Sequence, residues 1–431
     1  MKILFVSLGC DKNLVDSEKM LGMLQEKGYA FTDDEAEADV VVVNTCCFIG
    51  DAKEESINTL LQMGELKDSG QVKALIAAGC LAQRYKEEIQ KEIPGVDAII
   101  GTMAIDKITE SVDKALAGRS ENYFKDISAT PVYGKKRIVT TGGHYAYMKI
   151  AEGCDKHCTY CIIPSLRGNY RSVPMERLLK EAESLAEKGV RELILVAQET
   201  TLYGVDLYGK KMLPELLHKL AEIPGIYWIR IQYCYPEEIT DDFIEAIRTE
   251  EKVCHYLDVP IQHASDRILK RMGRRTTKQE LVDIIGKLRR EIPDITLRTT
   301  LIAGFPGETE EQFEDLCSFV KEVQFDRLGC FAYSAEENTV AAGMDGQIEQ
   351  EVKDKRAELV MQIQTGIMAQ KQAAKVGQTV RVICDGIDDE SGLYLCRTAA
   401  DAPEVDGNVC VSSEEPLYPG AFYDILVDDS D

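Results

Sequence analysis

The sequence lacks long apolar runs, low-complexity tracts and internal repeats. Its longest apolar stretches, such as residues 40–43 and 74–78, are far shorter than the roughly 18 residues that a membrane-spanning helix needs. This shortage excludes a transmembrane protein. The hydrophobic fraction, 45% of 431 residues, is large enough for several buried cores and therefore excludes a disordered chain. At roughly 150 residues per domain, the length predicts about three domains.

The N-terminus also lacks the features of a secretory signal. Its apolar stretch is short, and Cys10 is followed at once by Asp11 and Lys12 without a small-residue cleavage pattern. We therefore expect a cytoplasmic protein without a membrane anchor. In a reducing cytosol, the 14 cysteines are expected to be metal ligands, catalytic thiols or small core residues, and not disulfides.

Positive charge is scarce. Lys and Arg number 50 against 74 Asp and Glu, which gives a net charge of −24, and residues 376–431 hold 13 acidic residues with only Arg381 and Arg397. So acidic a surface repels phosphate backbones unless basic residues gather in one patch, whereas it attracts basic proteins. A solvated acidic face that only aids solubility is the alternative interpretation.

Apolar strands alternate with amphipathic helices in the first part of the chain. The strands are predicted at residues 2–7, 40–43, 73–78 and 96–100, and the helices at residues 16–27, 51–66 and 84–92. This alternation predicts a parallel, doubly wound sheet.

Cys10, Cys46 and Cys80 each come just after one of the first three predicted strands. Because the carboxyl ends of parallel strands lie at one edge of a sheet, where ligands bind, the three thiols are expected to converge into a metal or cluster site. The alternative is three ordinary buried cysteines, which are common. Cys47 is expected to point away from this edge, into the core.

A polar, turn-rich segment at residues 127–143 is interpreted as an interdomain linker. Beyond it, strands are predicted at residues 145–151, 193–197, 227–232, 256–260, 296–303 and 327–331, with helices at residues 175–188, 213–222, 237–248, 277–290 and 308–322. Six parallel strands with outer helices predict a partial (β/α)6 barrel whose active site lies at the carboxyl ends of the strands.

The last part of the chain changes character after a long polar helix at residues 349–375. Short strands are predicted at residues 379–384, 393–397, 408–411 and 422–427, separated by turn residues. This spacing predicts a small antiparallel β barrel. The fold class is therefore α/β, with a doubly wound sheet, a partial barrel and a small β domain in that order.

Three further cysteines, Cys154, Cys158 and Cys161, form a C-x3-C-x2-C run directly after the first barrel strand. Three thiolates within eight residues can bind three irons of a 4Fe-4S cluster and leave the fourth open for a substrate or cofactor. A zinc site completed by His157 or a distant residue is the competing interpretation, although structural zinc prefers paired C-x2-C halves.

The segment EGCDKHCTYCIIP resembles the signature of radical S-adenosylmethionine enzymes. SLGCDKNLVDSE, NTCCFIGDAKEES and GCLAQRY resemble the N-terminal domain of the methylthiotransferases, and the terminal β domain resembles a TRAM module. The resemblance covers essentially the whole chain. It implies an N-terminal domain at residues 1–126, a radical S-adenosylmethionine barrel at 140–348, a connecting helix at 349–375 and a TRAM-like domain at 376–431.

The resemblance implies an enzyme with two 4Fe-4S clusters, S-adenosylmethionine and a low-potential electron donor. Cys154, Cys158 and Cys161 would hold the cluster that binds S-adenosylmethionine, and Cys10, Cys46 and Cys80 the cluster that carries the transferred sulfur. Five further residues occupy positions of cofactor contacts, although a structural role would explain each of them equally well: Tyr160, Gln198, Glu199, Arg298 and Gly304. No side chain is assigned as a catalytic acid or base, because the cofactor carries the radical chemistry.

Two branches of this family differ in substrate, an adenosine of transfer RNA or an aspartate of small-subunit ribosomal protein number twelve. GCDKN stands where the RNA branch usually has GCQMN, and Asp155 and PIQHASDRILKRMGR also favour the protein branch. The acidic C-terminal domain is unsuited to strong RNA binding, but it suits a basic ribosomal protein, free or in the ribosome. The predicted reaction is insertion of a methylthio group at the β-carbon of the aspartate.

Other interpretations remain open in the sequence. The RNA branch is one alternative, and a non-catalytic iron-sulfur scaffold, which would explain both cysteine sets without a barrel, is another. Ala335 and Asn338 depart from the Pro and Gly usual in the family, which affects a turn rather than the chemistry. The basic run RILKRMGRRTT is either a contact for ribosomal RNA or a solvated helix end.

Overall fold

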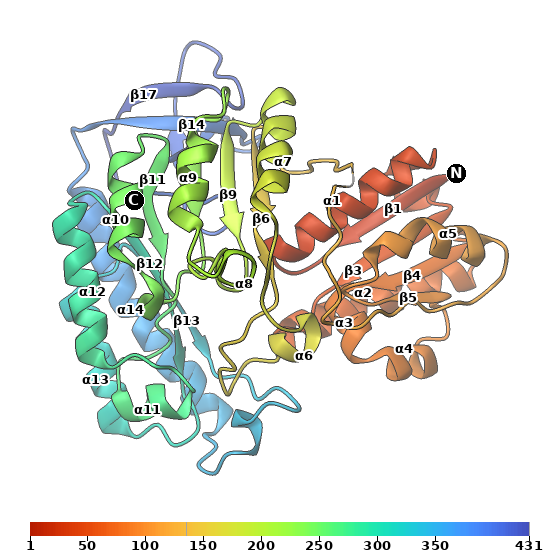
Figure 1. The fold of residues 1–431 in the computed structure, drawn as a ribbon, viewed down its shortest axis with the longest axis horizontal. Helices are drawn as coiled ribbons and strands as arrows, with labels where there is room; N and C mark the ends of the chain where they lie inside the picture. The colour runs from red at the N-terminus through yellow and green to blue at the C-terminus, as the bar shows by residue number, and fades with distance from the viewer. Residues whose placement is uncertain (135, 431) are drawn as a thin grey trace. The chain divides into compact units, whose positions relative to one another are not determined.

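The computed structural model describes residues 1–134 and 136–430 and divides the chain into two compact units (Figure 1). Unit 1 comprises residues 1–140, 151–155 and 161–173, and unit 2 comprises residues 141–150, 156–160 and 174–431. Residue 135, within the predicted linker, and residue 431, at the end of the predicted TRAM-like domain, lie outside the described residues. The four domain ranges expected from the sequence remain a prediction.

Unit 1 contains a five-stranded parallel sheet in the order β2-β1-β3-β4-β5, which confirms the predicted doubly wound sheet. The strands are β1 (Lys2–Ser7), β2 (Ala30–Thr32), β3 (Val40–Thr45), β4 (Ala74–Ala78) and β5 (Ala98–Ile100). The three-residue edge strand β2 was not predicted. The strand order reverses between β1 and β3, and the carboxyl ends at such a switch point are where ligands bind in open α/β sheets.

The two faces of this sheet form separate cores. Val41 and Val43 of β3 pack on the side of α2 (Gly50–Asp68), whereas Val40 and Val42 pack on the side of α1 (Asp11–Glu26). The alternation follows from the two-residue period of a strand. The other helices are α3 (Gly79–Arg84), α4 (Lys86–Glu92), α5 (Ile108–Leu116) and the 3-10 turns Glu35–Glu37 and Ile105–Lys107.

Two helix boundaries in unit 1 differ from prediction in a way that matters for the site. The helix α1 begins at Asp11, not at residue 16, so Cys10 is its N-terminal flanking residue. The predicted helix 84–92 is split into α3 and α4, and α3 already begins at Gly79, directly after β4. Hence Cys80 lies in the first turn of a helix rather than in a loop.

The predicted linker is ordered along α1 over its described residues up to Thr140. Arg137 and Glu18, both buried, form an ion pair of 2.5 Å, and the Thr140 backbone N–H donates to Glu18 Oε1 over 2.7 Å. A Cβ on Gly22 of α1 would lie 2.0 Å from the Lys136 carbonyl oxygen. This segment therefore packs on unit 1, because the buried carboxylate of Glu18 needs partners that only a nearby chain segment can provide.

Unit 1 also includes the short strands β7 (Ala151–Glu152) and β8 (Arg171–Ser172), which pair antiparallel, and the helix α6 (Ile163–Arg167). These elements flank the C-x3-C-x2-C run in the sequence.

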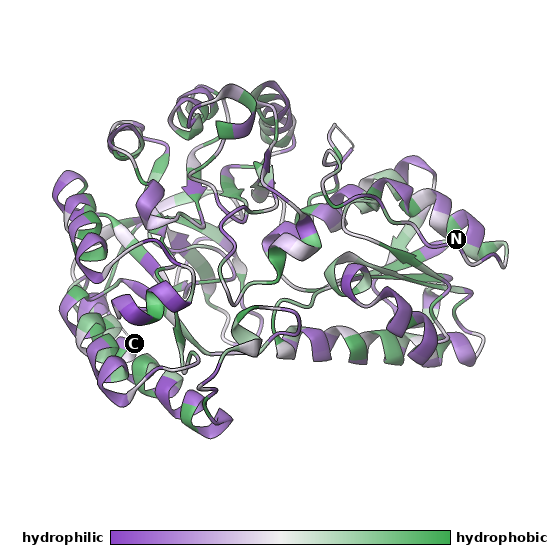
Figure 2. Cartoon of the chain, turned by 60° about the horizontal axis from the view of Figure 1, so that its bottom comes forward, coloured by the Kyte–Doolittle hydropathy of each residue, from purple (hydrophilic) through white to green (hydrophobic). Residues whose placement is uncertain are grey.

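Unit 2 is built on six parallel strands, as predicted, and their order in the sheet is β13-β12-β11-β10-β9-β6. The strands are β6 (Tyr145–Lys149), β9 (Glu192–Val196), β10 (Trp228–Ile231), β11 (Val253–Asp258), β12 (Thr296–Ala303) and β13 (Arg327–Ala332). The predicted helices correspond to α7 (Met175–Glu187), α9 (Leu213–Ala221), α10 (Asp241–Thr249), α12 (Lys278–Glu291) and α13 (Glu310–Val323). Figure 2 shows helices that carry both hydrophobic and hydrophilic residues along their length.

The short helices α8 (Val205–Tyr208) and α11 (Asp266–Arg271) and the 3-10 turns Pro236–Glu238 and Ala341–Gly343 were not predicted. Elements of three to six residues are too short to show a clear 3.6-residue period.

The C-terminal part follows the helix α14 (Gln350–Ala373) and forms a four-stranded antiparallel sheet, in agreement with the prediction. Its order is β16-β15-β14-β17, from β14 (Thr379–Ile387), β15 (Tyr394–Thr398), β16 (Val409–Val411) and β17 (Phe422–Leu426). Ile383 and Phe422 share a hydrophobic cluster with Trp228 and Tyr256 of the barrel strands. Across the described part of the chain, no helix is both long and apolar enough to cross a bilayer.

Candidate metal centres and cofactor site

The first trio, Cys10, Cys46 and Cys80, lies at the carboxyl edge of the unit 1 sheet. Cys10 precedes α1, Cys46 follows β3 and Cys80 is the second residue of α3. Burial, together with the nearby thiols of Cys80 and Cys10, raises the pKa of Cys46 to about 12. The structure thus brings the three thiols within electrostatic reach of one another. Cys46 and Cys80 are buried, whereas Cys10 is exposed.

Polar side chains beside the cysteines hold the loops after β1 and β3 together. Asn13 Nδ2 donates to the carbonyl oxygens of Leu8 over 2.7 Å and of Thr45 over 3.3 Å. The Ser56 hydroxyl accepts from the backbone N–H of Cys46 and donates to its carbonyl oxygen, over 2.9 and 2.8 Å. These bonds satisfy backbone groups that the end of the sheet would leave unpaired, and they fix where Cys46 points.

Close backbone approach also requires glycine before the cysteines. Gly9 has φ +89°, and a Cβ there would lie 2.6 Å from the Cβ of Cys46. Gly153, before Cys154, has φ +80°, and a Cβ there would lie 2.1 Å from the Asn169 carbonyl oxygen. Only glycine allows both this backbone conformation and this contact.

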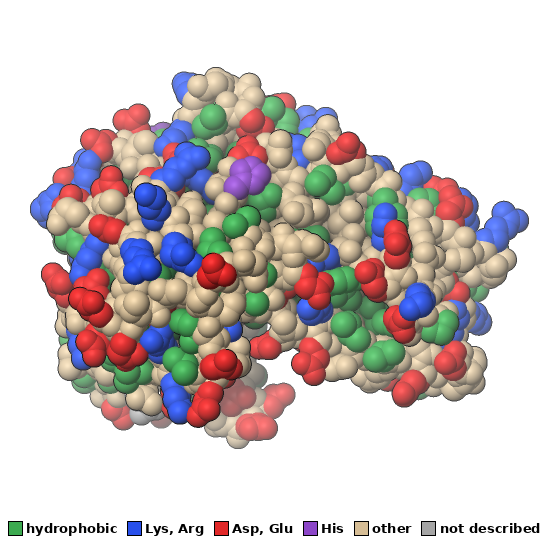
Figure 3. Space-filling model, turned by 90° about the horizontal axis from the view of Figure 1, so that it is seen from below, with side chains coloured by type: hydrophobic (Ala, Val, Ile, Leu, Met, Phe, Trp, Pro, Cys, Tyr) green, Lys and Arg blue, Asp and Glu red, His purple; other side chains and the backbone are tan. Residues whose placement is uncertain are grey.

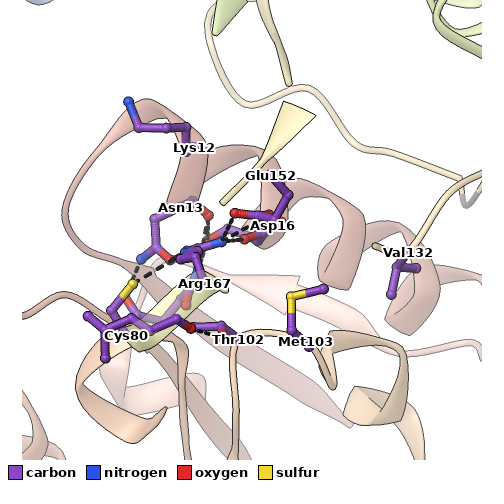
Figure 4. Close-up of polar contacts among 12 residues, drawn as sticks. Lys12, Asn13, Asp16, Cys80, Thr102, Met103, Val132, Glu152 and Arg167 are labelled. Atoms are coloured by element: carbon purple, nitrogen blue, oxygen red, sulfur yellow. Dashed lines mark hydrogen bonds and ion pairs between the residues drawn. The ribbon is translucent and has the colours of Figure 1, made fainter. Parts of the chain in front are cut away.

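A buried arginine, Arg167 at the end of α6, contacts the first trio (Figure 4). Its Nη2 lies 3.4 Å from Cys80 Sγ, and its Nη1 lies 2.7 Å from Asp16 and 3.3 Å from Glu152. Nη2 also donates to Asn13 Oδ1 over 3.1 Å. Burial alone would lower the pKa of Arg167, but Cys80, Glu152 and Asp16 raise it well above its ordinary value. The guanidinium is therefore a permanent positive charge beside Cys80.

The electrostatics of Cys80 follow from the same contacts. Burial raises the pKa of the Cys80 thiol, Arg167 lowers it and Cys10 raises it. Cys47 is fully buried in the core on the α2 face, as expected, but the same hydrophobic cluster includes Cys80. Burial, together with the nearby Cys80 thiol, raises the pKa of Cys47 to about 12. That Cys47 points away from the edge stays a prediction.

The second trio lies on the chain between β7 and α6, and its members belong to both units. In unit 1, Cys154 is buried and its backbone N–H donates to the Gly168 carbonyl oxygen over 3.1 Å, while Cys161 is half-buried. In unit 2, Cys158 is buried with its Sγ 3.4 Å from the Tyr235 hydroxyl. The exposed His157 has φ 51°, which turns the chain between the cysteines.

The sequence did not predict that Tyr235 and Arg274, the latter in the basic run RILKRMGRRTT, lie near Cys158. Arg274 is buried and stacks on the ring of Tyr235, with 4.1 Å from its guanidinium carbon to the ring centroid. Lys156 Nζ lies 4.8 Å from the same centroid. No motif connects Tyr235 and Arg274 with the cysteine run, because their chain positions are 77 and 116 residues beyond Cys158.

Glu199 is the predicted cofactor contact whose environment is most unusual. It follows β9, is buried, and its Oε2 has no hydrogen-bond partner among the described residues. Burial raises the pKa of Glu199 to about 7, although Thr201 and Lys156 oppose the shift. A buried, unpaired carboxylate oxygen at the carboxyl end of a barrel strand suits a hydroxyl or amine donor of a bound cofactor. Gln198, its half-buried neighbour, lies at the same strand end.

The other predicted cofactor contacts have partners within unit 2. Tyr160 packs against a hydrophobic cluster that includes Met272 and Phe305. Arg298 lies 3.2 Å from Asp258 and 3.7 Å from Asp406. The Gly304 backbone N–H donates to Glu308 Oε2 over 3.0 Å, and its φ of +74° is that of a turn. Their assignment as cofactor contacts stays a prediction.

The residues of the first trio fit an iron-sulfur cluster by their chemistry, since three thiols and a fixed cation surround one edge of the sheet. Among the described residues, no three His, Cys, Asp or Glu side chains are arranged to hold a single metal ion. A cubane cluster sets a different requirement, because each thiolate binds its own iron atom.

A cavity of about 620 Å³ lies elsewhere in unit 2. Its lining includes Gly143 and His144, which precede β6, and Arg191, which precedes β9. It therefore opens at the amino ends of barrel strands, the opposite end from Glu199.

Comparison with known proteins places these features in a family. Residues 148–320 match the radical SAM superfamily, residues 2–101 match uncharacterized protein family UPF0004, and residues 376–431 match the TRAM domain. A protein of Lachnoclostridium phytofermentans named ribosomal protein uS12 methylthiotransferase RimO is 60% identical over 427 residues, which cover 99% of this chain and 97% of the relative. The chain belongs to the RimO family.

Other RimO proteins are similar over the same length. The relative from Thermoanaerobacter sp. is 49% identical, covering 99% of this chain and 97% of its own, and the one from Clostridioides difficile is 48% identical, covering 100% and 97%. As a member of the radical SAM superfamily, the RimO-family chain uses S-adenosylmethionine and a 4Fe-4S cluster.

Solved structures show the fold alone. The radical S-adenosylmethionine methyltransferase TsrM from Kitasatospora setae aligns with TM-score 0.55 and 14% identity, covering 77% of this chain and 74% of that one. The cobalamin-dependent radical enzyme OxsB aligns with TM-score 0.54 and 13% identity, covering 84% and 56%.

Replacing Arg167 by Met is expected to destabilise the metal-free protein by about 3–5 kcal/mol, because Asp16 and Glu152 would remain buried without their cation. Urea unfolding of the apoprotein measures the effect. The control is Arg248→Met, which breaks an exposed pair with Glu245 and should leave the urea midpoint nearly unchanged, because water screens an exposed ion pair. If the two substitutions lowered the unfolding free energy equally, the buried network would contribute no more to stability than an exposed ion pair.

Glu199→Gln is expected to change the pH dependence of stability. Because the folded pKa of Glu199, about 7, exceeds its ordinary 4.5, the wild type loses stability as pH rises from about 4.5 to 7, while the variant does not. Relative to the variant, the wild type should lose about 3 kcal/mol of unfolding free energy over this pH range, since one pKa unit corresponds to roughly 1.4 kcal/mol. Thermal unfolding of the apoprotein between pH 5 and 8 measures it, with the exposed Glu215→Gln as control. If the unfolding temperatures of wild type and Glu199→Gln changed equally with pH, the raised pKa of Glu199 would be contradicted.

Proposed function

We propose that this protein transfers a methylthio group to the β-carbon of an aspartate in ribosomal protein uS12, in the cytoplasm, using two 4Fe-4S clusters and a low-potential electron donor. The observation that supports the proposal is the position of Cys10, Cys46 and Cys80, each just after a parallel strand at one edge of the unit 1 sheet, in a chain whose full-length relatives are named uS12 methylthiotransferases.

Each cysteine trio would hold one cluster. Cys154, Cys158 and Cys161 would leave one iron free for S-adenosylmethionine, and Cys10, Cys46 and Cys80 would leave one iron free for the sulfur to be transferred. When bound, S-adenosylmethionine would supply the methyl group of the methylthio unit and, in a second molecule reduced by one electron, the radical that removes a hydrogen atom from the substrate, while the second cluster would supply the sulfur.

The chain's own residues bind and orient these groups. Arg167 donates to Cys80 Sγ, which favours the thiolate form that a cluster requires. Glu199 Oε2 would accept a hydrogen bond from the cofactor, because it is buried and has no such partner in the described part of the protein. The Tyr235 hydroxyl lies beside Cys158 and would limit water access to that thiolate.

The charge distribution supports a protein substrate over transfer RNA. Of the two arginines in residues 376–431, Arg397 is buried in ion pairs with Glu192 and Asp385, and only Arg381 is exposed. The TRAM-like sheet therefore offers one exposed arginine for phosphate contacts, whereas its many carboxylates suit a basic ribosomal protein.

Separate replacement of the two trios by alanine tests the proposal. Each triple variant, reconstituted anaerobically, should contain about half of the wild-type iron, because each removes one of two four-iron clusters. Loss of Cys154, Cys158 and Cys161 should abolish production of 5'-deoxyadenosine from S-adenosylmethionine, whereas loss of Cys10, Cys46 and Cys80 should abolish only modification of uS12, measured by peptide mass spectrometry.

The matched control replaces three cysteines outside both trios, Cys317, Cys330 and Cys410, and should leave iron content and both activities unchanged. If uS12 stays unmodified while transfer RNA is thiomethylated, the substrate is transfer RNA and the proposed substrate is wrong. Iron in both clusters without any 5'-deoxyadenosine would favour a scaffold, and zinc in place of iron would contradict the cluster assignment.

A further inference from the structure

The helix α11 and the turn after it concentrate positive charge in a chain that is acidic overall. Five basic residues lie between positions 267 and 275, in a chain of net charge −24. Arg267, Lys270 and Arg275 are exposed and form no ion pair within the described part of the protein. We name these three residues the α11 patch. Figure 3 shows Lys and Arg side chains gathered on the face that carries α11.

The other two basic residues of this run support the structure. Arg271 donates to the carbonyl oxygens of Pro306 over 3.0 Å and of Asp345 over 3.1 Å, which anchors the end of α11 without neutralising its charge. Arg274 is buried against Tyr235 and donates to the Pro260 carbonyl oxygen over 2.8 Å. The patch is therefore held on a fixed backbone.

The α11 patch borders the cluster-binding loop. The Thr159 backbone N–H donates to the Met272 carbonyl oxygen over 2.9 Å, and its hydroxyl donates to the Arg271 carbonyl oxygen over 2.8 Å. Thr159 is the residue after Cys158, so the end of α11 and this part of the loop share one backbone network. In addition, α11 follows β11 and lies on the carboxyl side of the barrel strands, where a barrel places its active site.

The three cations of the α11 patch, which form no ion pairs among the described residues, suit a polyanionic partner better than they suit the basic protein substrate. A basic ribosomal protein would be repelled by the patch, while phosphate groups would be attracted to it at distances up to about one Debye length, roughly 8–10 Å. The TRAM-like sheet, with Arg397 buried in ion pairs, does not offer an equivalent set of cations. Phosphate contacts carry no sequence information, but they set the register and orientation of a bound protein.

We infer that the α11 patch binds the phosphate backbone of ribosomal RNA, so that the enzyme recognises its protein substrate within an RNA-containing particle. This inference rests on the proposed function and names the second component of its substrate. The RNA orients the enzyme, while the acidic surfaces of the C-terminal sheet face the basic protein.

The test compares a charge-reversed patch with a matched control. The patch variant is Arg267→Glu, Lys270→Glu and Arg275→Glu. The control is Lys180→Glu, Lys219→Glu and Arg290→Glu, three exposed residues on α7, α9 and α12 that give the same change in net charge. Circular dichroism and iron content establish that both variants fold and load.

Binding to purified small ribosomal subunits and to free uS12 is measured between 50 and 200 mM salt. The patch variant should bind subunits roughly tenfold or more weakly than wild type, and the slope of log affinity against log salt should be smaller by about 2 to 3, since each phosphate contact contributes about 0.9. The control should keep the wild-type slope, and affinity for free uS12 should not fall in the patch variant.

Modification rates separate this inference from the proposed function. The ratio of the rate on subunits to the rate on free uS12 should fall at least tenfold in the patch variant only. An unchanged slope and ratio, with uS12 still modified, would overturn the inference and leave the proposed function intact. Equal losses in patch and control variants would also overturn it, because net charge alone would then explain the effect. If wild type modifies uS12 in neither form, the proposed function fails first.

Discussion

The common direction of the strands in the unit 1 sheet is the constraint on which the rest of the structure depends. Because β1, β3 and β4 are parallel, the residues that follow them meet at one edge, and the reversal of strand order beside β1 opens a site there. Three cysteines that are distant in sequence become neighbours for this reason. The glycine before Cys10 and the amide of Asn13 then bring the loops close enough for the thiols to act together.

A buried cation stabilises that edge at a cost. Arg167 is desolvated together with Asp16 and Glu152, and such a network repays its desolvation only when every charge has a partner. The arrangement also links two parts of the sequence, because Glu152 is two residues from Cys154 while Arg167 contacts Cys80. The fold therefore connects the backbone near one cysteine run to a thiol of the other trio through a single guanidinium.

Charge is distributed unevenly over the molecule, and this distribution has functional consequences. The C-terminal sheet exposes carboxylates and buries Arg397, whereas α11 exposes cations beside the loop of Cys158. Opposite charges on separate surfaces suit a composite partner made of a basic protein and an RNA backbone. Neither surface alone would discriminate such a particle from its separate components.

Local sequence patterns determined much of this protein: the parallel sheet, six barrel strands, the antiparallel C-terminal sheet and the spacing of both cysteine trios. Periodicity and spacing depend on near neighbours, so they can be read directly, except in short elements such as β2 and α11. Only the tertiary structure decided that Arg167 contacts Cys80, that residues 136–140 pack on α1, that Glu199 keeps an unpaired oxygen and that Arg397 is buried. Each of these depends on packing between segments far apart in the chain, which no local pattern encodes.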